Sequence, residues 1–244
     1  MSRTGRPAIQ RRALLALLGM PAGLGACAGL PGAEAFGTPV APLVGTGFAA
    51  LHADGVGGAG AILGSAVSVA PGQVACTTHA LPRGADFVWL RRGDGAPPAR
   101  VPVLARSPRM DLSILGDPAG LLLPAHSSGQ AVLAGDPVWA AGMPGIGPSV
   151  ATGTVEIPDA ILPRFGRGFT ARIPALMGYS GGPVVGSDGR LRGLVSALAE
   201  DGGAGMLALL SGMDLGGLAG RRGRQVFVLS IHEIMEEAGK LRAA

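Results

Sequence analysis

The stretch Gly178-Tyr179-Ser180-Gly181-Gly182-Pro183 decides how this sequence is interpreted. It places a serine hydroxyl between glycines, so that a substrate backbone can approach closely. A serine hydroxyl is a weak nucleophile until a neighbouring base takes its proton. The stretch therefore predicts Ser180 as a nucleophile. It also predicts the backbone N–H groups of Gly178 and Ser180 as an oxyanion hole, which binds the negative oxygen of a tetrahedral intermediate.

Two upstream segments contain the partners that such a serine needs. Ala75-Cys76-Thr77-Thr78-His79-Ala80 is a strand-like run that ends in a histidine, and Met110-Asp111-Leu112-Ser113-Ile114-Leu115 starts an apolar run with an aspartate. Neutral imidazole can accept the serine proton near neutral pH and later deliver it to a leaving group. The aspartate would accept a hydrogen bond from the other ring nitrogen and fix its tautomer. We therefore predict catalytic roles for His79 and Asp111 beside the serine.

The composition favours an all-β fold. The chain has 244 residues, which is enough for one or two compact domains. Its 43 glycines and 20 prolines separate many short apolar runs, as in β-sandwiches and barrels. We predict two packed β-barrels over residues 43–128 and 129–244, with the histidine and aspartate in the first and the serine in the second. The second domain ends in a short helix, because Ser230 and Glu233 form a capping box there.

The N-terminal region is typical of an exported protein. Residues 1–26 are predicted to be a signal peptide, because Arg11-Arg12 precede an apolar run that small residues follow. Leu24-Gly25-Ala26-Cys27 resembles a bacterial lipobox, which implies cleavage before Cys27 and its acylation. Residues 27–42 are predicted to be a Gly/Pro/Ala-rich tether. We expect a periplasmic or cell-envelope protein that is lipid-anchored through the cysteine. Ordinary secretion and an uncleaved signal anchor remain open alternatives.

The charge argues against a nucleic-acid partner. Removal of residues 1–26 lowers the number of basic residues from 20 to 16, which equals the number of acidic residues. Without a basic surplus, membrane contact is expected only through the lipid anchor. Four scattered histidines and one retained internal cysteine, Cys76, offer no metal-ligand spacing, so we expect neither a metal nor another cofactor. The expected role of that cysteine is a small buried core residue.

The chain order His79, Asp111, Ser180 resembles that of the trypsin-like serine proteases, and within them the HtrA/Deg-type branch. The three segments quoted above are similar to that family's histidine, aspartate and nucleophile motifs. Further similar segments are Gly135–Pro144, Ser149–Val155 and Gly193–Ala197. The resemblance covers about residues 43–240. It implies a double six-stranded β-barrel of the chymotrypsin type and hydrolysis of peptide bonds through an acyl-enzyme intermediate. It further implies a protein or peptide substrate that contacts Ser196 and Met177.

Some features depart from that family. Tyr179 replaces the Asn or Asp that usually precedes the nucleophile, no PDZ domain is expected, and residues 201–220 form a glycine-rich insertion. Two other functions therefore stay open. One is a catalytically inactive, protease-like binding lipoprotein. The other is a serine esterase or lipase, whose nucleophile elbow also reads Gly-x-Ser-x-Gly, although a strand-like run rather than a helix follows here. The oligomeric state is not predicted.

Overall fold

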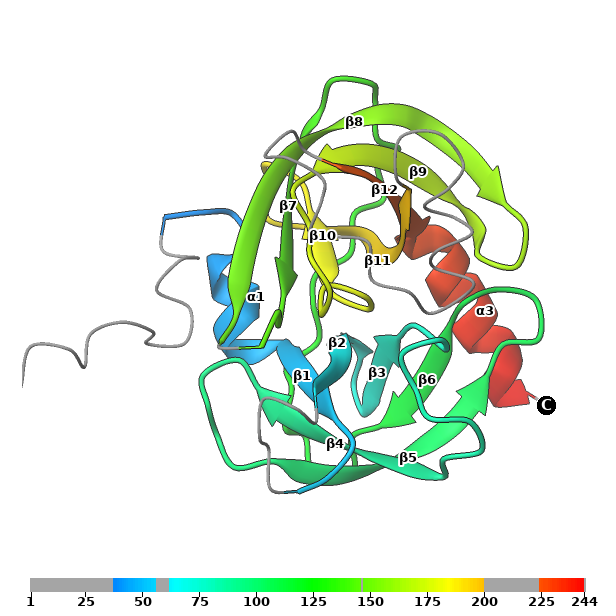
Figure 1. Cartoon of the computed structure of the whole chain (residues 1–244). Helices are drawn as coiled ribbons and strands as arrows, with labels where there is room; N and C mark the ends of the chain where they lie inside the picture. Colours follow the sequence, from blue (N-terminus) through cyan, green and yellow to red (C-terminus); the bar gives the residue numbers. More distant parts are fainter. Residues whose placement is uncertain (1–36, 56–61, 146, 200–223, 244) are drawn as a thin grey trace, which may run out of the picture.

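The computed structural model describes residues 37–55, 62–145, 147–199 and 224–243, and it confirms the all-β prediction. Two closed barrels, each of six antiparallel strands, lie one above the other in Figure 1. A C-terminal helix completes the arrangement. This is the chymotrypsin fold, as the family resemblance implied.

The first barrel closes in the order β1-β2-β3-β6-β5-β4. Its strands are β1 (Phe48–His52), β2 (Ile62–Ala70), β3 (Gln73–Cys76), β4 (Phe87–Arg92), β5 (Ala99–Arg106) and β6 (Ser113–Gly116). The turn Pro71-Gly72 joins β2 to β3, and Gly72 supplies the positive φ of +71° that this tight connection needs. Alternate side chains point into the barrel, where they form an apolar core that includes Leu51, Val74, Leu90, Val101 and Leu115.

The second barrel closes in the order β10-β11-β12-β9-β8-β7. Its strands are β7 (Pro137–Gly142), β8 (Ser149–Leu162), β9 (Gly166–Ile173), β10 (Pro183–Val185), β11 (Leu191–Ala199) and β12 (Arg224–Ser230). The core of this barrel includes Val138, Phe169, Tyr179, Val184 and Val228. Strands β8 and β9 form a long hairpin that arches over the top of the barrel in Figure 1.

A third apolar cluster joins the barrels to each other and to the helices. It contains Val44, Phe48, Val67, Leu112, Met143, Leu191, Leu229 and Ile234. Full burial of one such side chain is worth roughly 1.5–3 kcal/mol, so this shared core resists separation of the two halves. The seam between the barrels is therefore a fixed surface on which residues from both can meet.

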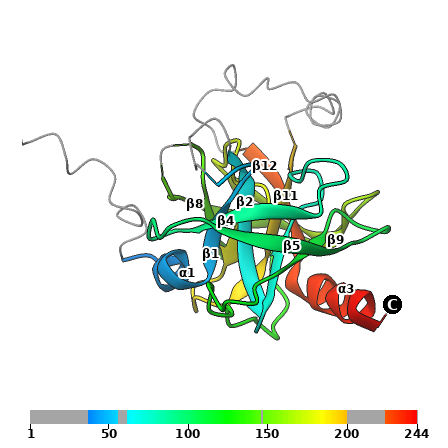
Figure 2. The same ribbon diagram turned by 90° about the horizontal axis from the view of Figure 1, so that it is seen from below.

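Two helices flank this seam at opposite sides of the molecule (Figures 1 and 2). Helix α1 (Ala41–Thr46) precedes β1, and Val40 just before it is fully buried. The packed chain thus begins a few residues earlier than the end of the predicted tether at residue 42, because Val40 and Val44 contribute to the core. Residues 1–36, with the predicted signal peptide and Cys27, lie outside the described residues.

Helix α3 (Ile231–Ala243) begins where the capping signal predicted it. The Ser230 hydroxyl accepts a hydrogen bond from the His232 N–H at 3.3 Å, and thereby satisfies one unpaired donor of the first turn. Ile234 and Ala238 turn into the shared core, whereas Glu236 lies in solvent. Neither helix in the described part of the chain has the length and apolar character needed to cross a membrane.

Candidate active site

The Asp111 carboxylate binds His79 through two hydrogen bonds. The His79 Nδ1 lies 2.7 Å from Oδ2, and the backbone N–H of His79 donates to Oδ1 at 3.0 Å. Strand pairing explains why His79 and Asp111 lie close together, since β3 and β6 are antiparallel neighbours with Cys76 opposite Ser113. His79 follows the end of β3 and Asp111 precedes the start of β6, so both residues emerge from the same end of one strand pair.

A third donor to this carboxylate comes from the other barrel. The Ser196 hydroxyl donates to Asp111 Oδ2 at 2.7 Å. A β-bulge between Val195 and Ala197 leaves Ser196 unpaired with β12 and turns it out of the regular ladder. The whole residue is buried and its hydroxyl is engaged, so the substrate contact at Ser196 stays a prediction. Sequence analysis did not identify this link, because no local pattern pairs a serine with an aspartate 85 residues away.

The exposure of the pair differs sharply between its two members. The His79 side chain is 36% exposed and that of Asp111 only 7%. An ionised carboxylate can only accept hydrogen bonds, so Nδ1 carries the hydrogen and Nε2 keeps its lone pair. Donors from His79 and Ser196 compensate the desolvation of the buried acid. The arrangement thus leaves a fixed proton acceptor on the solvent side of the imidazole.

The loop that carries Ser180 lies against the histidine segment. A Cβ built on Gly64 of β2 would lie 2.8 Å from the Ser180 carbonyl oxygen and 3.2 Å from the Ala80 Cβ, so both groups flank one point. Figure 1 shows the segment before β10 reaching down to β2 and β3. Within the described residues, no hydrogen bond joins the Ser180 hydroxyl to His79. The structure therefore brings the two segments together, with the side chains not yet bonded.

The glycines of this loop are required by the protein's own backbone. Gly178 has a φ of +94°, and a Cβ there would lie 2.1 Å from the Met143 carbonyl oxygen. Gly181 has a φ of +82°, and its Cβ would lie 2.1 Å from the Ser65 carbonyl oxygen. Sequence analysis attributed these glycines to a close approach of the substrate; at Gly181 the close partner is strand β2.

Two N–H groups of the loop remain available to a ligand. In the described part of the chain, neither the Gly178 N–H nor the Ser180 N–H donates to a protein acceptor. Their neighbours are engaged, since the Tyr179 N–H donates to the Leu176 carbonyl and the Gly182 N–H to the Tyr179 carbonyl. Free donors two residues apart on a constrained loop suit an anionic oxygen.

Tyr179 anchors this loop in the second barrel. Its side chain is only 2% exposed, and its hydroxyl donates to the Ser149 Oγ at 2.9 Å. The ring packs flat against Gly142, where an added Cβ would lie 2.4 Å from a ring carbon. Gly142 thus makes room for the aromatic residue that departs from the family pattern. Packing of this uncharged ring thus contributes to holding the loop.

The remaining predicted positions differ in accessibility. The side chain of Met177 is 59% exposed beside the loop and can contact a ligand, while Ala175 is fully buried. Cys76 is buried, and burial raises the pKa of its thiol, so it remains a protonated core residue as expected. The insertion at residues 201–220 lies outside the described residues.

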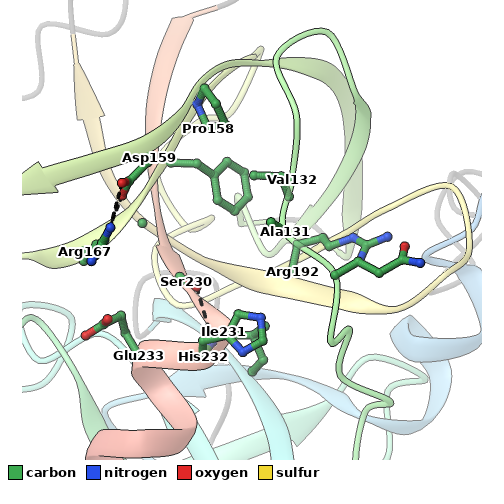
Figure 3. Close-up of a pocket in the computed structure, with 13 residues that line it drawn as sticks. Ala131, Val132, Pro158, Asp159, Arg167, Arg192, Ser230, Ile231, His232 and Glu233 are labelled. Atoms are coloured by element: carbon green, nitrogen blue, oxygen red, sulfur yellow. Dashed lines mark hydrogen bonds and ion pairs between the residues drawn. The ribbon is translucent and has the colours of Figure 1, made fainter.

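A cavity of about 360 Å³ lies apart from these residues, beside the start of α3 (Figure 3). Its lining includes Phe169 and Arg192 of the second barrel and His232 of α3. Asp159 and Arg167 pair across its edge. None of the predicted catalytic residues lines this cavity, so the candidate site is the open seam around His79 and Ser180.

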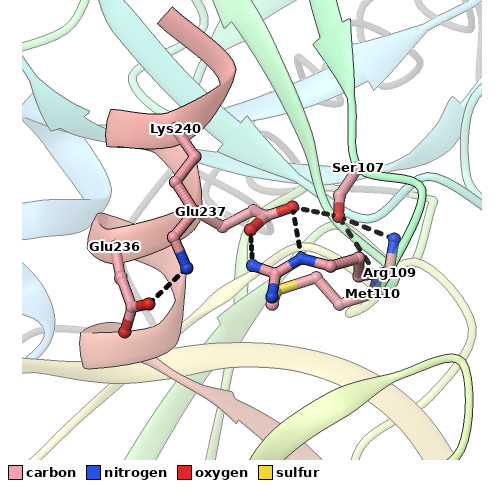
Figure 4. Close-up of polar contacts among 6 residues, drawn as sticks. All are labelled: Ser107, Arg109, Met110, Glu236, Glu237 and Lys240. Atoms are coloured by element: carbon pink, nitrogen blue, oxygen red, sulfur yellow. Dashed lines mark hydrogen bonds and ion pairs between the residues drawn. The ribbon is translucent and has the colours of Figure 1, made fainter. Parts of the chain in front are cut away.

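Helix α3 holds the segment that carries Asp111 (Figure 4). The buried Glu237 accepts a hydrogen bond from the Ser107 hydroxyl at 2.6 Å and forms an ion pair with Arg109. The Ser107 oxygen in turn accepts from the backbone N–H groups of Arg109 and Met110, at 3.1 and 3.2 Å. This network ties the loop just before Asp111 to the helix that follows the second barrel.

Comparison with known proteins supports the fold assignment. No protein-family model and no curated protein matches the chain by sequence. Among solved structures, the active form of the Rv3671c protease from M. tuberculosis is 21% identical, with a TM-score of 0.64 over 83% of each chain. The MamO protease domain from Magnetospirillum magneticum is 22% identical, with a TM-score of 0.59 over 80% of this chain and 97% of that one.

A third solved structure is the HtrA-type protease AlgW with a decapeptide. It is 22% identical, with a TM-score of 0.58 over 75% of this chain and 52% of that chain. At these identities the likeness establishes the fold. The resemblance to trypsin-like serine proteases of the HtrA type is thereby confirmed at the level of the fold.

Removal of the Glu237 charge should make the protein less stable in a pH-dependent manner. The hydrogen bond from Arg109 lowers the pKa of Glu237, and the Ser107 hydroxyl adds to this, while burial opposes it. A lowered folded-state pKa contributes stability above the unfolded pKa of about 4.3, and this contribution is lost as the pH falls through the folded value. Glu237→Gln should therefore cost about 1–3 kcal/mol at neutral pH.

Urea denaturation at a series of pH values measures this effect. The free-energy difference between wild type and Glu237→Gln should shrink as the pH falls. Glu236→Gln on the same helix is the matched control, because Glu236 is 62% exposed and pairs only with Lys240 in Figure 4. A Glu236→Gln loss as large as that of Glu237→Gln would contradict the structural role of Glu237.

Proposed function

We propose that this protein is an exported serine endopeptidase in which His79, Asp111 and Ser180 form the catalytic triad. The observation that carries the proposal is the hydrogen-bonded pair of His79 and Asp111, at 2.7 Å, in a seam that the Ser180 loop adjoins. The fold shared with solved serine proteases adds support. The missing hydrogen bond between serine and imidazole is compatible with catalysis, since such bonds often tighten only when substrate binds.

The proposed reaction uses each group once per half-reaction. Ser180 Oγ attacks the peptide carbonyl carbon while His79 Nε2 takes the hydroxyl proton. The carbonyl oxygen becomes an oxyanion that the N–H groups of Gly178 and Ser180 bind. The C–N bond then breaks, and the imidazolium gives its proton to the departing amine. Water repeats the sequence on the acyl-enzyme and releases the acid. Asp111 orients the imidazole and stabilises its positive charge.

The proposed substrate is a protein or peptide with an uncharged side chain at the cleavage site. Pro174 to Met177 precede the nucleophile loop and carry no charge, and the exposed Met177 and Leu176 offer apolar contact surface. The structure of the HtrA-type protease AlgW with a decapeptide supports a peptide as the ligand class. Ser196 would support this substrate indirectly, because its hydroxyl is bound to Asp111 and the residue is buried.

A fluorophosphonate probe tests the nucleophile directly, because it phosphonylates only an activated serine. The folded wild type should be labelled, and Ser180→Ala should not. The unlabelled wild type should also degrade casein, and labelling should abolish this activity. Labelling without casein cleavage but with hydrolysis of short acyl esters would favour an esterase. Absence of labelling from the folded wild type would leave a binding protein with a protease-like fold.

Asp111→Asn tests the role of the carboxylate. The amide would present an N–H to Nδ1 and favour the tautomer with a hydrogen on Nε2, which cannot accept the serine proton. We expect kcat on a peptide substrate to fall about 10⁴-fold, as for the same change in related triads. Circular dichroism should show an unchanged fold. A variant that keeps kcat within about tenfold of wild type would contradict this role.

We further propose that the signal peptide is cleaved before Cys27 and that Cys27 is acylated. The lipobox-like sequence supports this placement. Metabolic labelling with palmitate should tag the wild type in a bacterial host and should not tag Cys27→Ala, whereas Cys76→Ala should label like the wild type because Cys76 is buried. Labelling that persists in Cys27→Ala would show that the lipid is attached elsewhere.

A further inference from the structure

We propose that Ser65 is a positioning residue whose hydroxyl holds the oxyanion-hole loop in place across the seam. Ser65 lies on β2 of the first barrel and is fully buried, whereas the loop belongs to the second barrel. The inference rests on the proposed function, because it concerns the same reaction. No motif in the sequence assigns a role to this serine.

One residue binds the loop at two points. The Ser65 Oγ donates a hydrogen bond to the Gly178 carbonyl oxygen at 2.7 Å, and the Ser65 N–H donates to the Ser180 carbonyl oxygen at 2.8 Å. The same Oγ accepts a hydrogen bond from the Met143 N–H at 3.2 Å. The hydroxyl therefore donates its hydrogen to the loop and accepts, through one lone pair, from Met143 just after the end of β7.

These contacts restrict the peptide groups that border the oxyanion hole. Each peptide plane is rigid, so the two bonds fix the planes that join Gly178 to Tyr179 and Ser180 to Gly181, which lie on either side of the plane that carries the Ser180 N–H. Glycine at position 178 has a φ of +94° and no Cβ to resist rotation, so local sterics alone leave its peptide planes free to turn. The hydrogen bond from Ser65, together with that from the Met143 N–H, restrains the Gly178 carbonyl. With the planes on both sides of it held, the Tyr179–Ser180 peptide has less freedom to turn, so the Ser180 N–H that borders the oxyanion hole keeps its direction.

Loss of the hydroxyl should harm positioning more than folding. In Ser65→Ala, the Gly178 carbonyl oxygen and the Met143 N–H still bond to each other at 3.1 Å. The backbone bond from Ser65 to Ser180 also remains. No buried backbone group is left without a partner, so the variant should lose only one ordinary hydrogen bond and its melting temperature should fall only slightly.

Ser68 provides a matched control on the same strand. It is also fully buried, but its hydroxyl contacts the carbonyl oxygens of Ala70 and Gln73, at 3.4 Å, inside the first barrel. Ser65→Ala and Ser68→Ala thus remove the same atom from the same strand and differ in whether that atom touches the nucleophile loop.

The kinetic test compares wild type, Ser65→Ala and Ser68→Ala. The fluorophosphonate labelling rate and kcat on a peptide substrate should fall about 10- to 100-fold in Ser65→Ala, with KM changed less than threefold, because the oxyanion forms only in the transition state. Ser68→Ala should stay within about threefold of wild type in both. Equal losses in the two variants at equal melting temperatures would overturn the proposal.

Hydrogen exchange provides a readout that does not depend on activity. The hydrogen-bonded amides of Tyr179, Gly181 and Gly182 should exchange faster in Ser65→Ala than in wild type or Ser68→Ala, in the absence of substrate. Unchanged exchange of these amides would overturn the role of Ser65 even if the wild type is an active protease. Faster exchange in a protein that no fluorophosphonate labels would support the role of Ser65 and reject the proposed reaction.

Discussion

The rest of the site depends on the hydrogen bonding of the Asp111 carboxylate. It is a nearly buried anion, and such a group is stable only when donors surround it. His79 supplies two of these donors from the first barrel, and Ser196 supplies one from the second. Donors from both barrels thus compensate the buried charge of Asp111. The same carboxylate fixes which imidazole nitrogen carries the hydrogen and which one stays open to solvent.

Both apolar packing and polar contacts hold the two barrels together at the seam. The apolar cluster shared by both barrels provides most of the stabilisation, but the hydrophobic effect does not specify the orientation of individual loops. The orientation of these loops is set by polar contacts. Glu237 on α3 fastens the loop before Asp111, and Ser65 on β2 fastens the loop around Ser180. Each of these two hydrogen bonds joins chain segments more than 100 residues apart, so the site forms only when the whole fold is complete.

Tyr179 illustrates how the fold accommodates a departure from the family pattern. An aromatic ring before the nucleophile needs a space that a side chain at position 142 would fill, and a glycine stands there. The hydroxyl of the ring finds Ser149 at the start of β8. Tyr179 thus adds ring packing and a neutral hydrogen bond to the contacts that hold the loop.

The sequence by itself determined the fold class, the two-barrel division, the C-terminal helix, and the candidate nucleophile, base and acid. These depend on local chemistry, namely turn residues, apolar runs, a capping serine and short motifs around His79, Asp111 and Ser180. Only the tertiary structure decided that Ser196 binds Asp111, that Ser65 and Glu237 hold the two loops, and that Gly142 receives Tyr179. Those contacts join residues far apart in the chain. Which residues form these contacts depends on strand register, on a bulge and on the closure of two barrels. None of these can be recognised in a short stretch of sequence.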